Sequence, residues 1–159
     1  MLKNYSDFKL TDRNFNQKLL QWASRFKYCC LLDSNNHPSI KNKKHDILIG
    51  VSNTSKWSYN GNDSFSHLIK FSKNKWVFGH LSYDLKNETE PSLYSNNTDR
   101  IGFSNIHFFE PNILIQIKGV DIRISGTQPD KVYNDVLNES LIKKSSQHNI
   151  IIKNKLSKA

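Results

Sequence analysis

Trp76-Val-Phe-Gly-His-Leu-Ser-Tyr-Asp-Leu-Lys-Asn-Glu88 and Ile101-Gly-Phe-Ser-Asn-Ile-His-Phe-Phe-Glu-Pro111 are the stretches of this sequence that decide the fold. The first begins with two large apolar side chains, those of Trp76 and Phe78. Gly79 then permits a β-bulge or the close approach of another backbone. The second stretch is a further aromatic strand, which follows a polar loop. Together they predict paired strands of a buried sheet, and by themselves they indicate no chemistry.

Helices are predicted on both sides of these strands. The first follows a capping Thr11-Asp12 pair, the second spans residues 64–72, and the third spans residues 129–144. The residues expected to face the core are Phe15, Leu19, Trp22 and Phe26 in the first, Phe65, Leu68 and Ile69 in the second, and Val132, Val136 and Leu137 in the third.

Short apolar runs predict the remaining strands. They span residues 27–33, 46–51, 57–59, 104–110, 112–117 and 120–125, with a last extended piece at 150–152. Residues 104–125 read as three consecutive strands, turning at Pro111 and at Lys118-Gly119. Such short connections allow only antiparallel pairing. The predicted class is therefore α+β, a largely antiparallel sheet with flanking helices.

The chain is basic, with a formal net charge of +9. That charge suits an anionic partner, but lysine outnumbers arginine and is spread along the chain. The densest cluster, Lys41-Asn-Lys-Lys44, falls in a predicted loop. Aromatic and basic residues are not interleaved as in nucleic-acid-binding surfaces. We expect no nucleic-acid partner.

The two cysteines, Cys29 and Cys30, are adjacent. Neighbouring residues of a strand point to opposite faces, so an ordinary disulfide between them is excluded, and no second pair exists for a zinc site. Free thiols indicate a reducing compartment. The polar start at Met1-Leu-Lys-Asn does not resemble a signal peptide, and no apolar run is long enough to span a membrane. We expect a cytoplasmic protein without a membrane partner.

The best candidate for a ligand site is Asp33-Ser34, together with Asp46 and the basic loop between them. A serine hydroxyl at a strand end can donate and accept hydrogen bonds. The simpler interpretation is a turn serine that caps the strand. His80 and His107 are placed to face each other across strands, either as a metal or acid–base pair or as plain strand histidines. Tyr83-Asp84 places a phenol and a carboxylate at a strand end and could be taken for a catalytic pair.

Two of these motifs resemble a known family. Gly79-x-x-x-Tyr83-Asp84-Leu85 and Leu31-Leu32-Asp33-Ser34 are similar to elements in the amino-terminal half of the chorismate-utilising enzymes. These enzymes are component I of aminodeoxychorismate (para-aminobenzoate) synthase and component I of anthranilate synthase. The resemblance covers nearly all of the chain, although each motif is short. It implies the amino-terminal half of the anthranilate synthase component I-like fold.

The resemblance also implies a pocket for a tryptophan-like amino acid. Ser34 matches the serine of the family's motif, and residues 42–45 match the segment that closes over the ligand. The implied ligand-binding residues are Leu32, Asp33, Ser34, Asn42, Lys43, Lys44 and His45. Asp33 stands where anthranilate synthases favour glutamate, which puts regulation by tryptophan in doubt.

The implied activity is that of a longer parent enzyme. Residues 1–145 would form the amino-terminal domain, and residues 146–159 would begin the link to a carboxy-terminal half that binds chorismate and Mg²⁺. The parent would convert chorismate and ammonia to 4-amino-4-deoxychorismate for folate biosynthesis, with ammonia from a glutamine amidotransferase subunit. This chain would hold no catalytic residue and bind no metal, and its uncovered surface would favour self-association.

Three alternatives remain open at this point. The parent could instead be anthranilate synthase component I of tryptophan biosynthesis. The position of the first motif close to the amino terminus, the short loops and Asp33 favour aminodeoxychorismate synthase. The chain could also be a stand-alone module that binds amino acids or a protein. The third alternative is a basic nucleic-acid binder.

Overall fold

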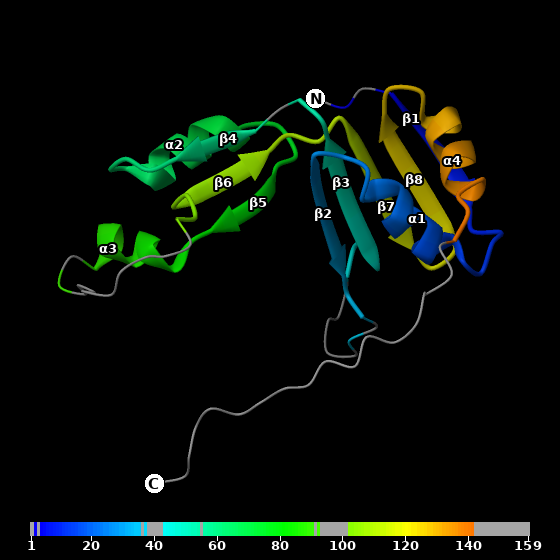
Figure 1. Cartoon of the computed structure of the whole chain (residues 1–159), viewed down its shortest axis with the longest axis horizontal. Coiled ribbons are helices and arrows are strands. Elements are labelled where there is room, and N and C mark those ends of the chain that lie inside the picture. Colours follow the sequence, from blue (N-terminus) through cyan, green and yellow to red (C-terminus); the bar gives the residue numbers. More distant parts are fainter. Residues whose placement is uncertain are drawn as a thin grey trace, which may run out of the picture.

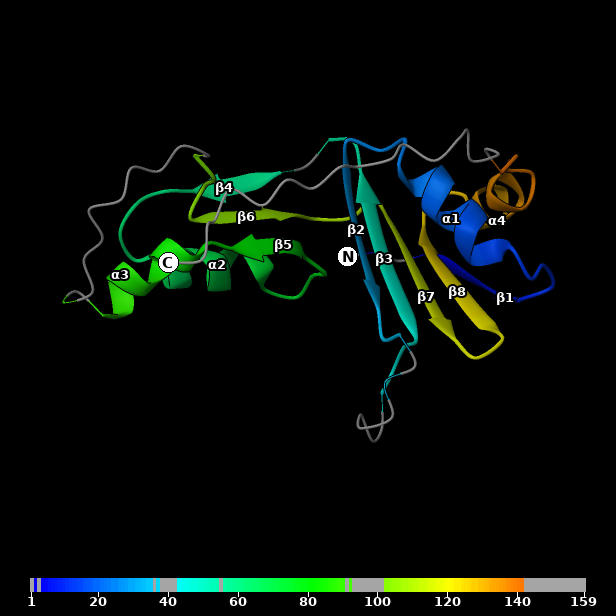
Figure 2. The ribbon, with the colours of Figure 1, turned by 60° about the horizontal axis from the view of Figure 1, so that its bottom comes forward.

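The computed structural model describes residues 2, 4–35, 37, 43–54, 56–90, 92 and 102–141. Its larger sheet has five strands in the order β1-β8-β7-β3-β2, and every neighbouring pair is antiparallel. The strands are β1 (Tyr5–Lys9), β2 (Tyr28–Asp33), β3 (Ile47–Ser52), β7 (Ile113–Lys118) and β8 (Asp121–Gly126). Helices α1 (Phe15–Ala23) and α4 (Pro129–Leu137) lie together over one face of this sheet (Figures 1 and 2).

The main core lies between that sheet and the two helices. Strand side chains alternate between faces, so Ile49, Ile115 and Ile124 point toward the helices and are fully buried. Phe15 and Leu19 of α1 meet them, as their helical spacing predicts. Further along the same layer the Tyr133 ring of α4 stacks on Phe8 of β1, with ring centroids 4.2 Å apart.

The opposite side of the five-stranded sheet is termed here the open face. Cys30, Leu48 and Leu114 lie on it, and Leu32 stands directly across from Leu48. Within the described residues no helix lies over this side (Figure 2). Among the described residues, the open face buries apolar surface where the second sheet and Leu2 meet it.

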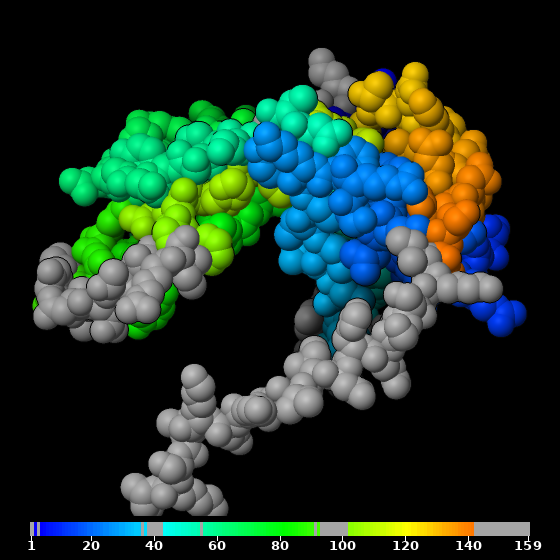
Figure 3. Space-filling model, in the orientation of Figure 1, coloured from blue at the N-terminus to red at the C-terminus, as the bar shows by residue number. Residues whose placement is uncertain are grey.

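The second sheet has three antiparallel strands in the order β4-β6-β5. They are β4 (Trp57–Tyr59), β5 (Phe78–Leu81) and β6 (Ile106–Phe109), accompanied by α2 (Ser64–Ser72), a 3₁₀ turn at Tyr83–Leu85 and α3 (Lys86–Thr89). In the space-filling view the two parts of the molecule join at one end and diverge from there (Figure 3). Phe78 forms that junction, because its ring lies directly over Gly50 of the open face, where a Cβ would come within 2.5 Å of it.

In the sequence, the whole three-stranded part is inserted between two strands that are neighbours in the larger sheet. β3 ends at Ser52 and β7 begins at Ile113, and these strands pair with each other. Asn112 closes the base of the inserted segment: its backbone N–H donates to the Val51 carbonyl at 2.9 Å, and its side-chain oxygen accepts from the Ser52 hydroxyl at 2.7 Å. Residues 53–111 thus leave and re-enter the larger sheet at a single point.

The structure confirms the α+β class and the antiparallel pairing, and it corrects several details. The expected three-strand meander at 104–125 is wrong, because β6 belongs to the other sheet and only β7 and β8 form a hairpin. Proline lacks the N–H that a continuing ladder needs, and the chain changes sheets at Pro111. Gly119, with φ of +58°, lies in the remaining turn. β1 was not predicted, because its exposed polar residues mask the alternation of an edge strand.

Two helices also differ from expectation. α2 has the predicted bounds, but Phe65 and Ile69 are exposed, and its inward contacts come from His67 and Phe71, which stack on rings of β4. α4 ends at Leu137 rather than at 144. The extended piece expected at 150–152 and the link expected at 146–159 lie outside the described residues.

Candidate functional site

The predicted ligand site lies where β2 and β3 meet the loop that joins them. The Ser34 backbone N–H donates to the Asp46 carbonyl at 2.8 Å, which extends the β2–β3 ladder by one step. The Asp33 carboxylate accepts the N–H of Asn35 at 2.7 Å, and Asn35 has a φ of +47°. This is the geometry of a side-chain-stabilised turn. Part of the polar capacity of Asp33 therefore stabilises the turn itself.

Lys43 connects both sides of this turn. Its ammonium group donates to the Ser34 hydroxyl at 3.2 Å and pairs with the Asp46 carboxylate at 2.7 Å. The pKa of Asp46 is lowered, first by the Gly119 N–H that donates to its carboxylate at 2.6 Å and then by Lys43. The Ser34 hydroxyl thus accepts a hydrogen bond from a lysine whose positive charge is balanced by the Asp46 carboxylate.

A shallow hollow of about 320 Å³ opens beside these residues. Leu32, Asp33, Ser34, Lys44 and His45 all line it, so the structure brings together five of the seven predicted residues. Lys43 does not line the hollow but is hydrogen-bonded to Ser34, which does. Asn42 lies outside the described residues.

The polar groups of the hollow are unequal. Burial lowers the pKa of His45, followed by the nearby Lys44 and Lys118 charges, and its Nε2 lies 3.2 Å from the Gln116 amide nitrogen. A neutral imidazole is therefore favoured at neutral pH. Lys44 forms no ion pair within the described part of the chain. The hollow offers one free cation, one hydroxyl and a turn carboxylate, which suit a small polar ligand held loosely rather than bond-breaking chemistry.

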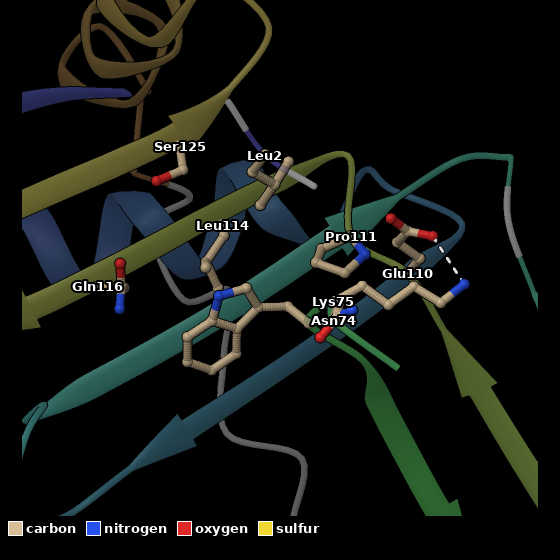
Figure 4. A pocket seen from close by; sticks show the side chains of 9 residues that line it. Leu2, Asn74, Lys75, Glu110, Pro111, Leu114, Gln116 and Ser125 are labelled. Carbon is tan, nitrogen blue, oxygen red and sulfur yellow. Dashed lines mark hydrogen bonds and ion pairs between the residues drawn. The ribbon is translucent and has the colours of Figure 1, made fainter. Parts of the chain in front are cut away.

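A larger cavity of about 700 Å³ lies elsewhere on the open face and was not anticipated from the sequence. Gln116 of β7 and Ser125 of β8 contribute to its lining (Figure 4). Trp76 from the segment before β5 also lines it. Trp76 is far in the chain from the β7–β8 hairpin that carries Gln116 and Ser125, and the three residues form no motif. Only the exposed position of Trp76, two residues before its strand, sets it apart from an ordinary core tryptophan.

The remaining candidates fit structural roles. His80 and His107 are cross-strand partners whose rings stack 5.7 Å apart, and burial, His80 and Lys56 lower the pKa of His107. Tyr83 is 82% exposed, with the Lys86 ammonium 4.7 Å from its ring. Both cysteines are free, and burial raises their thiol pKa values. Within the described residues no group of three or more His, Cys, Asp or Glu side chains is placed to hold a metal.

Comparisons with family models, with curated proteins and with solved structures found no match for this chain. No helix among the described residues combines the length and apolar character needed to cross a membrane.

Proposed function

We propose that this chain is the amino-terminal part of aminodeoxychorismate synthase component I. The observation that carries the proposal is the five-stranded sheet: two helices cover one of its faces, and no helix among the described residues covers the other. A sheet that buries one face in a full core and leaves apolar residues on the other is suited to packing against a second body. From the resemblance of the 31–34 and 79–85 segments to the chorismate-utilising enzymes, we infer that this second body is their catalytic half.

The exposed apolar residues support a missing covering element. Leu32 on β2 and Leu81 on β5 are each about half exposed, and Phe103 is 68% exposed. Scattered single apolar residues are normal on protein surfaces. Leu32, however, adjoins Leu48 on the open face. This sheet face is the surface on which we expect the catalytic half to pack, and without that half it favours self-association.

In this proposal the chain supplies support rather than chemistry. Chorismate and Mg²⁺ would bind in the catalytic half, and a glutamine amidotransferase subunit would supply ammonia for conversion of chorismate to 4-amino-4-deoxychorismate. The described residues bring together no group of side chains that could hold Mg²⁺, so in this proposal the catalytic half would supply the ligands of the metal. The chain alone is expected to form no product.

The hollow at Ser34 would be half of an amino-acid site. Its free groups can make two or three hydrogen bonds to a ligand, each contributing about 1 kcal/mol net. After the entropic cost of association, this supports binding no tighter than about 1 mM. Residues of the catalytic half would have to complete the pocket before tryptophan is held well.

The test is complementation by a separate catalytic half. The chain is co-expressed with the chorismate-binding half of an aminodeoxychorismate synthase, and product is assayed with chorismate, Mg²⁺ and ammonium. We expect a complex and product formation. A matched pair of variants locates the interface: Leu32→Asp on the open face should abolish both, whereas Leu20→Asp on α1 should not, although the two leucines are 55% and 54% exposed.

Several outcomes would contradict the proposal. Turnover by this chain alone would show that catalytic groups lie within it. Failure of the folded chain to bind the catalytic half, or equal loss with both aspartate variants, would remove the role of the open face. Anthranilate in place of 4-amino-4-deoxychorismate would favour the other parent enzyme. Micromolar tryptophan binding by the chain alone, abolished by Ser34→Ala, would indicate a stand-alone amino-acid module.

A further inference from the structure

The cavity of about 700 Å³ lies between the segment before β5 and the open face (Figure 4). Its volume of about 700 Å³ is typical of small-molecule sites. Buried Leu114 and Pro111 supply apolar lining, and Trp76 adds an indole ring that is 45% exposed. An exposed indole beside buried apolar side chains is a surface on which a flat ring can stack.

The charges that line this cavity are already engaged at one end of it. The Lys75 ammonium lies 3.2 Å from the Glu110 carboxylate and 4.1 Å from the centre of the Phe71 ring. Figure 4 shows this pair beside Pro111, away from Gln116 and Ser125. An anionic ligand in the rest of the cavity would therefore meet no free cation among the described residues that line it.

In the part of the cavity away from the Lys75–Glu110 pair, neutral hydrogen-bonding groups remain available. Within the described part of the chain, no side-chain hydrogen bond engages the Ser125 hydroxyl or the Trp76 indole N–H. The Gln116 amide uses its nitrogen end toward His45, which leaves its oxygen as an acceptor. An indole N–H only donates, an amide oxygen only accepts, and a hydroxyl does both.

We propose that this cavity binds an uncharged, planar, fused heteroaromatic ring that carries both a hydrogen-bond donor and an acceptor on its edge, the chemistry of a purine base. The ring would stack on the Trp76 indole and contact Leu114, and its edge would exchange hydrogen bonds with Gln116 and Ser125. This site is separate from the hollow at Ser34 and does not depend on the proposed enzymatic role.

The test uses inosine, an uncharged and soluble purine nucleoside, with the full chain alone. Titration calorimetry should show saturable binding that is insensitive to salt, and benzoate, a charged single ring, should not compete. Trp76→Leu should weaken binding about 5- to 150-fold, the range of base–aromatic stacking. Ser125→Ala should weaken it about 2- to 10-fold, the loss of one hydrogen bond. Tyr83→Leu, which removes an 82% exposed aromatic residue outside the cavity, should have no effect.

Circular dichroism establishes that each variant is folded. If Trp76→Leu is not folded, the nearly isosteric Ser125→Ala variant decides. The proposal is overturned if the folded chain shows no saturable inosine binding, or if binding is unchanged in the folded variants. It is also overturned if binding disappears at high salt, which would indicate attraction to the basic surface. Because the chain is tested alone, none of these results bears on complementation of a catalytic half.

Discussion

The two sheets of this molecule bury their apolar residues in different ways. In the five-stranded sheet, aliphatic residues such as Ile49 and Ile115 are completely enclosed by helices α1 and α4. In the three-stranded sheet, much of the packing is between aromatic rings that remain partly exposed: Trp57 stacks on Phe71 at 4.9 Å, and Tyr59 on His67 at 4.3 Å.

The difference shows how one chain can hold two levels of stability. Enclosed aliphatic side chains contribute roughly 1.5–3 kcal/mol each, whereas a stacked pair contributes about 0.5–1.5 kcal/mol beyond its buried area. Among the described residues of the three-stranded sheet, Ile106 is fully buried, and Phe78 and Phe109 are nearly so. We therefore expect it to open locally while the five-stranded sheet stays folded.

The strongest challenge to this comparison is removal of a ring from the main core. Phe15→Ala should lower the free energy of unfolding by about 3–5 kcal/mol, because Phe15 is fully buried against the sheet. Leu20→Ala, on the exposed side of the same helix, should cost less than about 1 kcal/mol. Urea unfolding followed by circular dichroism measures both. Equal effects would show that α1 does not form the core described.

A second substitution acts on the contact between the two sheets. Gly50→Ala places a methyl group against the Phe78 ring and should cost about 1–3 kcal/mol by overpacking. Phe78→Leu should relieve part of this cost, so a double-mutant cycle should be non-additive. Hydrogen exchange in Gly50→Ala should rise in β5 and β6 more than in β3. Additive effects, or a uniform rise in exchange, would contradict a junction at this position.

Protonation of His107 in the three-stranded sheet is expected to change stability less than either of the two preceding substitutions. The folded-state pKa of His107 lies below its ordinary value of 6.5, through burial and the His80 and Lys56 charges. The unfolded chain therefore takes up a proton first as the pH falls below about 6.5, so stability is lost on acidification through that range. His107→Gln should flatten the thermal stability profile between about pH 7.5 and 5.5. An unchanged slope would assign the pH dependence to other groups, such as His45.

The smallest effect is expected at the predicted ligand site. Ser34→Ala removes one partly exposed hydrogen bond from Lys43 and should change stability by about 0.5 kcal/mol or less. Ser64→Ala provides the matched control. The Ser64 hydroxyl is fully buried, and the Glu88 carboxylate and the Gly61 carbonyl are both within hydrogen-bonding distance as acceptors for its one proton, so its loss should cost about 1–3 kcal/mol. A large effect of Ser34→Ala on unfolding would make Ser34 a structural residue rather than a ligand contact.

Local sequence patterns predicted where the helices and strands of this fold lie better than which of them pair or pack with one another. The spacing of Phe15, Leu19 and Trp22 correctly placed α1 and its buried face. The apolar run at residues 46–51 correctly indicated a buried strand, observed as Ile47–Ser52. The similar run at residues 27–33 proved to be an edge strand, Tyr28–Asp33, with Leu32 exposed. Apolar composition alone does not distinguish a central strand from an edge strand, because burial depends on neighbours supplied by distant parts of the chain.

The candidate sites show the same limit. Asp33, Ser34, Lys44 and His45 meet in one hollow because a single loop joins their two paired strands, and such local proximity can be read from sequence order. The larger cavity joins residues from β7, β8 and the segment before β5. Its existence depends on which face of the sheet the inserted segment packs against. No residue pattern within any one element carries that information.

The single point at which the inserted segment leaves and re-enters the sheet makes the three-stranded part removable by design. Val51 and Ile113 are paired neighbours of an antiparallel ladder, and Asn112 is already hydrogen-bonded to Val51 and Ser52. A two-residue Asn-Gly turn, the natural closure of adjacent antiparallel strands, could therefore replace residues 53–111. The product would be a miniature protein that keeps the strand order, both helices and the main core. Conversely, the same point is an insertion site, at which an unrelated domain could replace the three-stranded part without altering the connectivity of the five-stranded sheet.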